Sequence, residues 1–164
     1  MIIEGDNITR EEIINIRIEE DLDFEIQQLN FSRYEVEDGT ILRILNIPTK
    51  IFRLADYDKQ GFPEYLVQHK NIVSALVPQE LRGEASHEIF NLKKDRVDII
   101  EFIPLEEPFN EFKLGDGTLL RIRLIVNQVF KSEKRNYLGE PIYVIDSLIS
   151  ITRKIPDHLR KNNS

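Results

Sequence analysis

The sequence predicts a mainly β protein built from one antiparallel unit that is written twice. Three observations lead to this prediction. The segment YEVEDGTILRI at positions 34–44 returns as FKLGDGTLLRI at positions 112–122. Apolar and polar residues alternate through much of the chain, which is the period of a strand with one buried face. Each copy also carries an Asp-Gly pair between two alternating runs, a strong local signal for a β-hairpin.

The internal repeat extends well beyond these eleven residues. When the chain is shifted against itself by 78 positions, residues 22–82 align with residues 100–160 without a gap, and about sixteen of the sixty-one aligned pairs are identical. The identities fall on turn residues and on alternating apolar positions, where a shared backbone would require them. A fixed period indicates a repeated supersecondary unit. We therefore expect two copies of about four strands each.

The first strand is predicted over Ile14–Ile26, where apolar residues alternate with polar and mostly acidic ones. Before it, Thr9 and Glu12 have the spacing of a capping box, which indicates a brief helical turn. In the second copy the segment DRVDIIEFIPL predicts a shorter strand. Pro104 is expected to end it, because proline cannot donate to a strand ladder.

A hairpin follows in each copy. The first has a strand over Phe31–Glu37, a turn at Asp38-Gly39 and a long return strand over Thr40–Leu54. In the second copy the chain turns at Asp116-Gly117 and returns over Thr118–Ser132. An Asp-Gly pair in this setting favours a two-residue type I′ turn, in which both central residues have positive φ. In the second copy, Gly115 leaves room for a bulged variant of the turn.

Each return strand is predicted to contain a β-bulge. Inward-facing apolar residues are expected first at even positions, Leu42 and Ile44, and then at odd positions, Ile47 and Ile51. The second copy changes parity in the same way. A period of two that slips by one residue requires an extra residue in one strand.

The last strand of each unit is predicted over Tyr65–Val77 and over Tyr143–Ile155. Pro78 and Pro156 end these strands, and the following segments QELR and DHLR each predict a single helical turn. The connecting segment Gly83–Lys94 is expected to be partly helical.

The two units give roughly eight strands, which predicts either a closed pseudo-twofold barrel or two packed half-barrels with short helical turns. Residues 1–83, which include an N-terminal extension, are the first repeat, and residues 84–164 are the second. A unit of about 60 residues has a marginal core by itself, so we expect the repeats to pack as one globular unit. Two independent small barrels on a tether are the alternative.

The composition of the chain excludes several kinds of functional site. The chain has no cysteine, which excludes disulfides, thiolate metal sites and cysteine nucleophiles, and its three histidines are widely separated. No apolar run approaches the roughly 20 residues of a membrane span, and the start of the chain lacks a basic-then-apolar signal. We therefore expect a cytoplasmic protein without a cofactor or a metal ion. Few glycines, many isoleucines, absent cysteine and abundant Glu with Lys or Arg favour a heat-adapted source, whereas the numerous asparagines argue against one.

The paired Asp-Gly-Thr triplets raise one catalytic hypothesis. Two aspartates related by an internal twofold axis are the reactive pair of aspartic proteases, but those enzymes have the order Asp-Thr/Ser-Gly. Turn geometry accounts for Asp38 and Asp116 without catalysis. The chain has no glycine-rich phosphate loop and no Gly-x-Ser-x-Gly sequence. His69, the one histidine inside a strand pattern, is interpreted as a hydrogen-bonded core residue.

Charge is distributed unevenly along the chain, whose formal net charge is −7. Twelve acids and three bases lie between Glu4 and Asp38, whereas nine bases and four acids lie between Thr118 and Lys161. Opposite patches on one molecule steer association with a partner of complementary charge or with a second copy.

Arginines at equivalent places of the two hairpins are candidate binding residues. In a two-residue hairpin, Arg43 and Arg121 would lie across from Tyr34 and Phe112, and each guanidinium would cover a ring. The second repeat adds further bases around Arg121, and positions 121, 123 and 131 share one face if the bulge is ignored. A basic stripe of this kind can bind nucleic acid. The predicted binding residues are Arg43, Arg121, Arg123, Lys131 and Arg135.

We expect a non-enzymatic interaction module, an all-β adaptor that binds a protein partner or associates with itself. Its acidic first strand or its exposed sheet edges would form the contact. The alternative is an RNA- or ribosome-associated factor that uses the basic face of the second repeat. A small-ligand enzyme is a third interpretation, because barrels often hold pockets, but the sequence indicates no reactive group.

Overall fold

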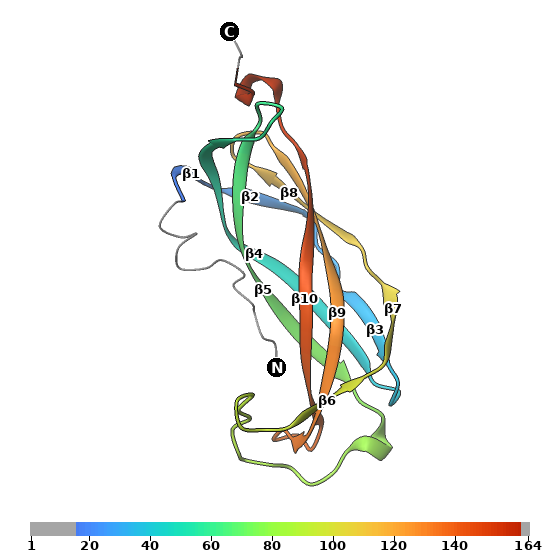
Figure 1. Cartoon of the computed structure of the whole chain (residues 1–164). Coiled ribbons are helices and arrows are strands. Elements are labelled where there is room, and N and C mark those ends of the chain that lie inside the picture. Colours follow the sequence, from blue (N-terminus) through green and yellow to red (C-terminus); the bar gives the residue numbers. More distant parts are fainter. Residues whose placement is uncertain (1–15, 162–164) are drawn as a thin grey trace.

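The computed structural model describes residues 16–161. This part of the chain forms ten strands and two single turns of 3₁₀ helix (Figure 1). The fold is mainly β, as the alternating sequence predicts. The elements are β1 (Ile18–Leu22), β2 (Phe24–Gln28), β3 (Ser32–Val36), β4 (Ile41–Tyr57), β5 (Pro63–Leu76), η1 (Gln79–Leu81), β6 (Val97–Ile100), β7 (Phe102–Glu106), β8 (Phe109–Leu114), β9 (Leu119–Arg135), β10 (Pro141–Lys154) and η2 (Asp157–Leu159).

The strands form two antiparallel sheets of five strands each. In the first sheet, β4 pairs with β5 along one side and with β3 and β1 along the other, and β7 lies beyond β3. In the second sheet, β9 pairs with β10 along one side and with β8 and β6 along the other, and β2 lies beyond β8. Both sheets are open within residues 16–161, so the closed barrel, one of the two expected arrangements, is not found.

Elements of the two halves occupy matching positions in the sequence. The bounds of β9, β10 and η2 are those of β4, β5 and η1 moved by 78 residues. The glycines with positive φ follow the same spacing: Gly39, Gly61, Gly117 and Gly139. The long strands of the two halves therefore have the same order, the same length and the same glycine turns.

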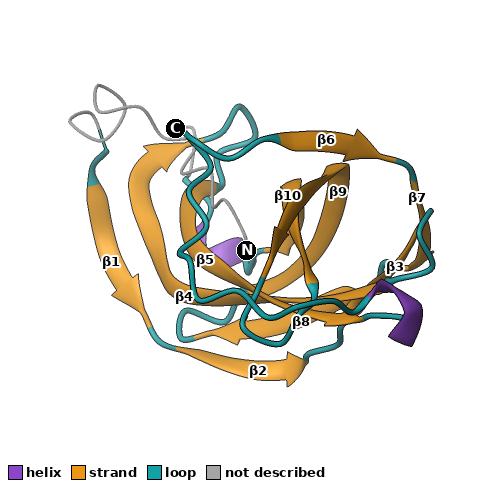
Figure 2. Ribbon diagram, turned by 90° about the horizontal axis from the view of Figure 1, so that it is seen from below, coloured by secondary structure: helices purple, strands orange, loops and turns teal. Residues whose placement is uncertain are grey.

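Two strands lie in the sheet formed mainly by the other half. Strand β2 pairs with β8, with Ile26 opposite Phe112, and β7 pairs with β3, with Pro104 opposite Tyr34. Each segment begins in its own sheet, as β1 or β6, and ends in the other. Figure 2 shows β1–β2 and β6–β7 on opposite outer sides of the molecule. Backbone pairing thus joins the two halves.

The hairpin turns differ from the predicted type I′. Among residues 16–161 only glycines have positive φ, and Gly39 and Gly117 are both at +90°. The amide of Gly39 donates to the carbonyl of Val36 at 2.8 Å. This geometry is a three-residue loop, a type I turn followed by a glycine bulge. The prediction is wrong because a type I′ turn needs positive φ at Asp38 as well, whereas here glycine alone takes that conformation.

The predicted β-bulges are confirmed. The register between β4 and β5 shifts between Pro48 and Lys50, and the register between β9 and β10 shifts at Asn127, 78 positions after Thr49. Buried residues of β4 lie at even positions up to Pro48 and then at the odd position Ile51. The change of face comes slightly later than the sequence pattern indicates, because Ile47 is half-buried on the outer face.

The interior contains two clusters of buried apolar side chains, and each cluster takes residues from both halves. Fully burying one such side chain contributes about 1.5–3 kcal/mol, and both halves supply such side chains to each cluster. The first cluster contains Tyr34, Val36, Leu42, Ile44, Leu124, Val126, Val129, Tyr143 and Ile145. The second contains Leu22, Ile51, Phe112, Leu114, Leu120 and Ile122.

Other local predictions need correction. Strand β7 continues through Pro104, because the edge of a sheet tolerates a residue that cannot donate. The segment Gly83–Lys94 contains no helix. The strand predicted over Ile14–Ile26 is interrupted at Asp23, whose carboxylate accepts the amide of Phe24. The residues before position 16, including the predicted helical turn, lie outside the described part of the chain. None of the helices in residues 16–161 is long and apolar enough to cross a membrane.

Candidate interaction surfaces

The predicted binding residues do not form one basic stripe. Arg121 and Arg123 lie together, with their guanidinium groups 4.4 and 5.5 Å from the centre of the Phe109 ring. The bulge in β9 reverses the alternation, so Lys131 points to the other face, where its ammonium lies 2.8 Å from the Asp38 carboxylate. The stripe was predicted by ignoring the bulge, and the bulge separates its members.

The remaining two predicted residues lie elsewhere. Arg43 is in the first sheet, where it donates to the Ser74 hydroxyl at 2.9 Å and covers the Phe31 ring at 5.6 Å. Arg135 donates to the carbonyl groups of Leu81 and Gly139. Arg135 therefore links the backbone at Leu81 to the backbone at Gly139, and its guanidinium group is partly engaged by these two carbonyls.

The predicted ring contacts of Arg43 and Arg121 involve different rings from those expected. The three-residue turn places Tyr34 opposite Leu42 and Phe112 opposite Leu120. Both predicted rings are fully buried, at 0% exposure. The cation–π contacts instead use Phe31 and Phe109, which are themselves equivalent residues of the two halves.

Acidic neighbours also compensate the arginines of β9. Arg121 forms an ion pair with Glu111 at 3.0 Å, and Arg123 lies 4.0 Å from Glu107. A phosphate backbone would have to displace these carboxylates. The arrangement gives no support to the nucleic-acid alternative.

The first Asp-Gly-Thr triplet binds a tyrosine from the second half. The hydroxyl of Tyr143 donates to Oδ2 of Asp38 at 2.5 Å and lies 2.8 Å from the hydroxyl of Thr40. Lys131 donates to the same carboxylate oxygen at 2.8 Å. The other carboxylate oxygen accepts the backbone amide of Thr40, which closes the turn.

The second triplet repeats this geometry with a tyrosine from the first half. The hydroxyl of Tyr65 donates to Asp116 at 2.8 Å and lies 2.8 Å from Thr118. Arg53 occupies the place of Lys131, at 3.2 Å from the Asp116 carboxylate, and also pairs with Glu20 at 2.8 Å. The two networks are equivalent contacts between the halves.

Burial and hydrogen bonding set the protonation states in these networks. Burial would raise the pKa of Asp38, but hydrogen bonds from Lys131, Tyr143 and Thr40 outweigh it and lower that pKa below its ordinary value. The pKa of Asp116 is lowered for the same reason, against the effect of burial. Burial raises the pKa of Tyr65 to about 12 and that of Tyr143 further still. At neutral pH protonated tyrosines therefore donate to ionised aspartates.

These contacts bear on the paired-aspartate hypothesis. Asp38 and Asp116 belong to separate networks, each with its own tyrosine, threonine and cation, so they do not share a proton. The turn interpretation is correct but incomplete, because Asp38 also joins the halves through Tyr143. Tyr65 and Tyr143 are 78 positions apart and are therefore equivalent in the repeat, but the sequence does not indicate the partner of either hydroxyl.

A buried polar cluster lies between β4, β5 and β10. The Asn46 side chain, in a residue only 2% exposed, lies 2.8 Å from Nδ1 of His69 and donates to Asn71 at 2.6 Å. His69 is hydrogen-bonded, as interpreted from the sequence. Asn46 was not among the predicted functional residues, although the alignment of the repeats places this polar residue opposite the apolar Leu124. Within residues 16–161 no three metal-ligating side chains gather into a cation site.

An exposed acidic surface lies along the outer edge of β1 and β2. Of their ten residues, all but Leu22 and Phe24 are exposed. Each strand has one hydrogen-bonded neighbour, β4 or β8, so its other side is a free edge in the part of the chain that the structure describes. We call this surface the β1–β2 edge.

Residues 18–28 contain five acids and no base. Arg53 pairs with Glu20 and Lys50 pairs with Asp21, both at 2.8 Å. The other three, Glu19, Asp23 and Glu25, form no ion pair with the described residues. The edge therefore carries uncompensated negative charge beside exposed apolar groups such as Ile26.

The equivalent edge of β6 and β7 differs at one backbone position. Pro104, opposite Tyr34, is the counterpart of Ile26, opposite Phe112. A proline on an edge strand removes one donor that an added strand would use.

Comparisons with protein-family models, curated proteins and solved structures find no match to this chain. We therefore infer function from the geometry of these surfaces.

Proposed function

We propose that the chain is a non-enzymatic interaction module whose β1–β2 edge accepts an extended, basic segment of a protein partner. One observation carries the proposal. The edge is almost wholly exposed, has one free side of backbone groups, and contains five acids without a base. An extended peptide can add to such an edge as a further strand, with backbone hydrogen bonds supplying affinity and side chains supplying specificity.

The register indicates which backbone donor is available at the edge. A proline has no N–H, so the pairing of β7 with β3 uses no amide donor at Pro104. Ile26 holds the equivalent place in the pairing of β2 with β8. We infer that the amide of Ile26 points away from β8, toward an added strand.

Charge favours a basic partner over a second copy of this chain. Glu19, Asp23 and Glu25 would face carboxylates of the same edge if two copies paired through it. Like charges directly opposite each other destabilise strand pairing, whereas Lys or Arg residues on a partner would complement them. Acidic residues here also protect the edge against self-pairing, a common role of charge on edge strands.

We also propose that the two halves, residues 1–83 and 84–164, are copies of one ancestral unit that pack as two half-barrels. The constant spacing of 78 residues between strands, glycine turns and Asp-Thr-Tyr networks supports this proposal. The exchange of β2 and β7 supports this proposal as well, because β2 pairs with β8 as its counterpart β7 pairs with β3.

Fluorescence anisotropy of a labelled peptide with alternating Val and Lys, titrated with the full chain, tests the docking proposal. We expect saturable binding that weakens with salt, and no binding of the matched Val–Glu peptide. Ile26→Pro should weaken binding at least tenfold, because it removes the outward donor. Its fold should persist, because β7 accommodates Pro104 at the equivalent position.

A charge-matched pair of variants separates local from general electrostatics. Neutralising Glu19, Asp23 and Glu25 with Gln or Asn should weaken binding at least tenfold. The control neutralises Asp98, Glu101 and Glu106 on the β6–β7 edge and changes the net charge equally. The docking proposal fails if the two triple variants weaken binding alike, or if no peptide binding saturates.

A further inference from the structure

A cavity at the β6 end of the molecule is lined by a carboxylate whose only contact with a charged group of the described residues is one long ion pair. The cavity has a volume of about 380 Å³ and is bordered by β5, the start of β10 and the connecting segment. Its walls are mixed: Leu42, Val73, Ala75, Phe90, Pro141 and Ile142 are the apolar members, and Ser74, Asn136, Glu140 and Tyr143 are the polar members. This end is distinct from the β1–β2 edge proposed above.

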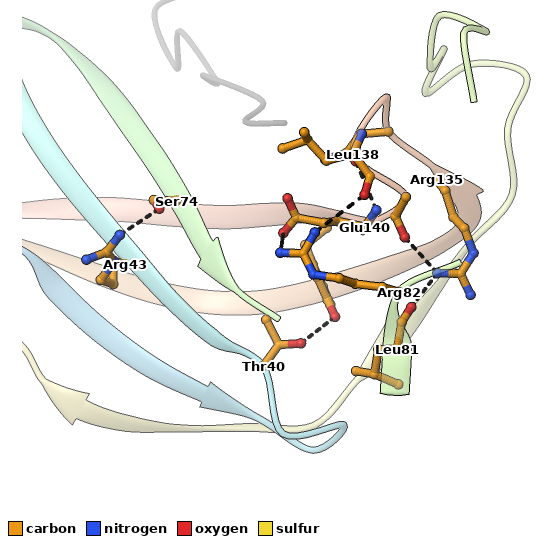
Figure 3. A network of polar contacts seen from close by, with 11 residues as sticks. Thr40, Arg43, Ser74, Leu81, Arg82, Arg135, Leu138 and Glu140 are labelled. Carbon is orange, nitrogen blue, oxygen red and sulfur yellow. Dashed lines mark hydrogen bonds and ion pairs between the residues drawn. The ribbon is translucent and has the colours of Figure 1, made fainter. Parts of the chain in front are cut away.

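Glu140 is the buried charge of this cavity. The residue is 8% exposed, and its backbone is held by Asn136. The only charged partner of its carboxylate among residues 16–161 is Arg82, at 3.8 Å, beyond hydrogen-bonding distance. Figure 3 shows Arg82 extended between Glu140 and the carbonyl of Leu138. Buried charges in proteins are normally paired and hydrogen-bonded. Because the Arg82 contact is longer than a hydrogen bond, the Glu140 carboxylate can still accept a further donor.

The equivalent position in the other half has a different side chain. Phe62 holds the position equivalent to Glu140, and Arg160 holds the position equivalent to Arg82. Arg160 binds the carbonyl of Gln60 at 2.8 Å, as Arg82 binds Leu138, and its guanidinium covers the Phe62 ring at 5.4 Å. At the opposite end of the molecule, the equivalent contact thus pairs an arginine with an apolar ring (Figure 1). The second half replaces the ring with a carboxylate beside a cavity.

The surrounding turn is built to hold Glu140 in place. Gly139 has a φ of +76°, and its carbonyl accepts the amide of Gly83 at 2.9 Å and a guanidinium N–H of Arg135 at 3.0 Å. The turn is thus held to the connecting segment (Figure 3). A rigid turn presents the carboxylate at a fixed position, which lowers the conformational cost of binding a ligand.

We propose that this cavity binds an organic cation, an alkylammonium or alkylguanidinium group on an apolar stem, with Glu140 as its counter-ion. The cation donates hydrogen bonds to the carboxylate, and its stem packs against Val73, Ala75 and Phe90. Arg82 is 37% exposed in its side chain, so it can remain on the Leu138 carbonyl at the rim. The same chemistry is offered by a free amine and by a Lys or Arg side chain of a peptide.

Two-dimensional NMR titration of the full chain tests this site with butylguanidinium and, as its neutral isostere, butylurea. We expect saturable shifts of the amides of residues 73–75, 140, 142 and 143 with butylguanidinium only. Glu140→Gln should weaken binding at least tenfold. Glu140→Phe, which copies the other half, should abolish binding and keep the fold. Glu133→Gln, an exposed carboxylate on β9, should leave affinity within twofold and controls for net charge.

Each result decides the proposal. Butylurea binding as tightly as butylguanidinium would show an apolar cavity without a cation site and would overturn it. Equal affinity of butylguanidinium for wild type and Glu140→Gln, or no saturable shift with butylguanidinium, would also overturn it. A third arm compares a capped Gly-Arg-Gly peptide with free butylguanidinium. Tighter binding of the peptide identifies a side chain of a macromolecule as the source, and tighter binding of the free cation identifies a small molecule.

Discussion

The phenolic hydroxyl of Tyr143 lies 2.5 Å from the carboxylate of Asp38, 105 positions earlier in the chain. The equivalent hydroxyl of Tyr65 lies 2.8 Å from Asp116, 51 positions later. Each bond links the hairpin turn of one half to the last strand of the other. The two contacts are therefore cross-links between the halves, and they sit on the turns that the repeated triplets encode.

Removing either hydroxyl should destabilise the whole fold. A hydrogen bond to a charged group contributes about 1.5–3 kcal/mol, so Tyr143→Phe and Tyr65→Phe should each lower the free energy of unfolding by that amount in urea denaturation. Tyr137→Phe is the control, because Tyr137 is 71% exposed and should change stability by less than about 0.5 kcal/mol. Losses no larger than that of Tyr137→Phe would mean that the contacts do not stabilise the fold.

The repeated triplets also make stability depend on acid pH. The folded pKa values of Asp38 and Asp116 lie below their ordinary value of 3.8. The unfolded state therefore binds more protons, and the stabilisation is complete above pH 4 and lost as pH falls through the folded pKa values. Thermal melts from pH 6 to pH 2.5 should show a steep loss in the wild type and a flatter profile in Asp38→Asn/Asp116→Asn. Parallel profiles would contradict this assignment.

A side chain at the glycine of each hairpin bulge should destabilise the fold. Gly39 has a φ of +90°, and an added Cβ would lie 3.3 Å from Pro78; Gly117 has the same φ and a clearance of 3.2 Å from Pro156. Strained backbone of this kind costs about 1–3 kcal/mol, so each Gly→Ala change should lower stability by that amount.

Gly115 provides the matched control for these substitutions. It lies two positions before Gly117 but outside the left-handed region, and an added Cβ would meet Asp23 at an ordinary 3.4 Å. Gly115→Ala should cost under about 1 kcal/mol. Similar melting temperatures for all three Ala variants would show that the glycine conformation is not required.

Local features of the fold could be read from the sequence because short-range chemistry encodes them. The strands follow the alternation, the hairpins follow the Asp-Gly pairs, and the bulges follow the change of parity near Thr49 and Asn127. The predicted turn type was wrong because an Asp-Gly pair is compatible with both a two-residue and a three-residue loop. That difference of one residue moved Arg43 away from Tyr34 and onto Phe31.

Long-range pairing could not be read in the same way. Alternation shows that β2 and β7 are strands, but it holds no information about which neighbour they choose, so their exchange between the sheets was not predicted. The candidate cation site had one overlooked signal. Glu140 aligns with the apolar Phe62 inside a well-matched stretch, and a charge at an apolar position of a repeat indicates a change of environment.

The exchange of β2 and β7 predicts how half of the chain behaves alone. A fragment of residues 84–164 lacks β2, so its β8 has a free edge, and its β7 lacks β3. Because β7 is the counterpart of β2, two fragments can satisfy each other, with β7 of each copy pairing with β8 of the other. Sedimentation velocity should therefore show a dimer whose thermal melting depends on concentration. A fragment of residues 107–164, without β6 and β7, should not form this dimer, since it lacks the exchanged strand. A fragment 84–164 that is monomeric and melts cooperatively would show that the halves are independent, and the proposal of mutual dependence between them would fail.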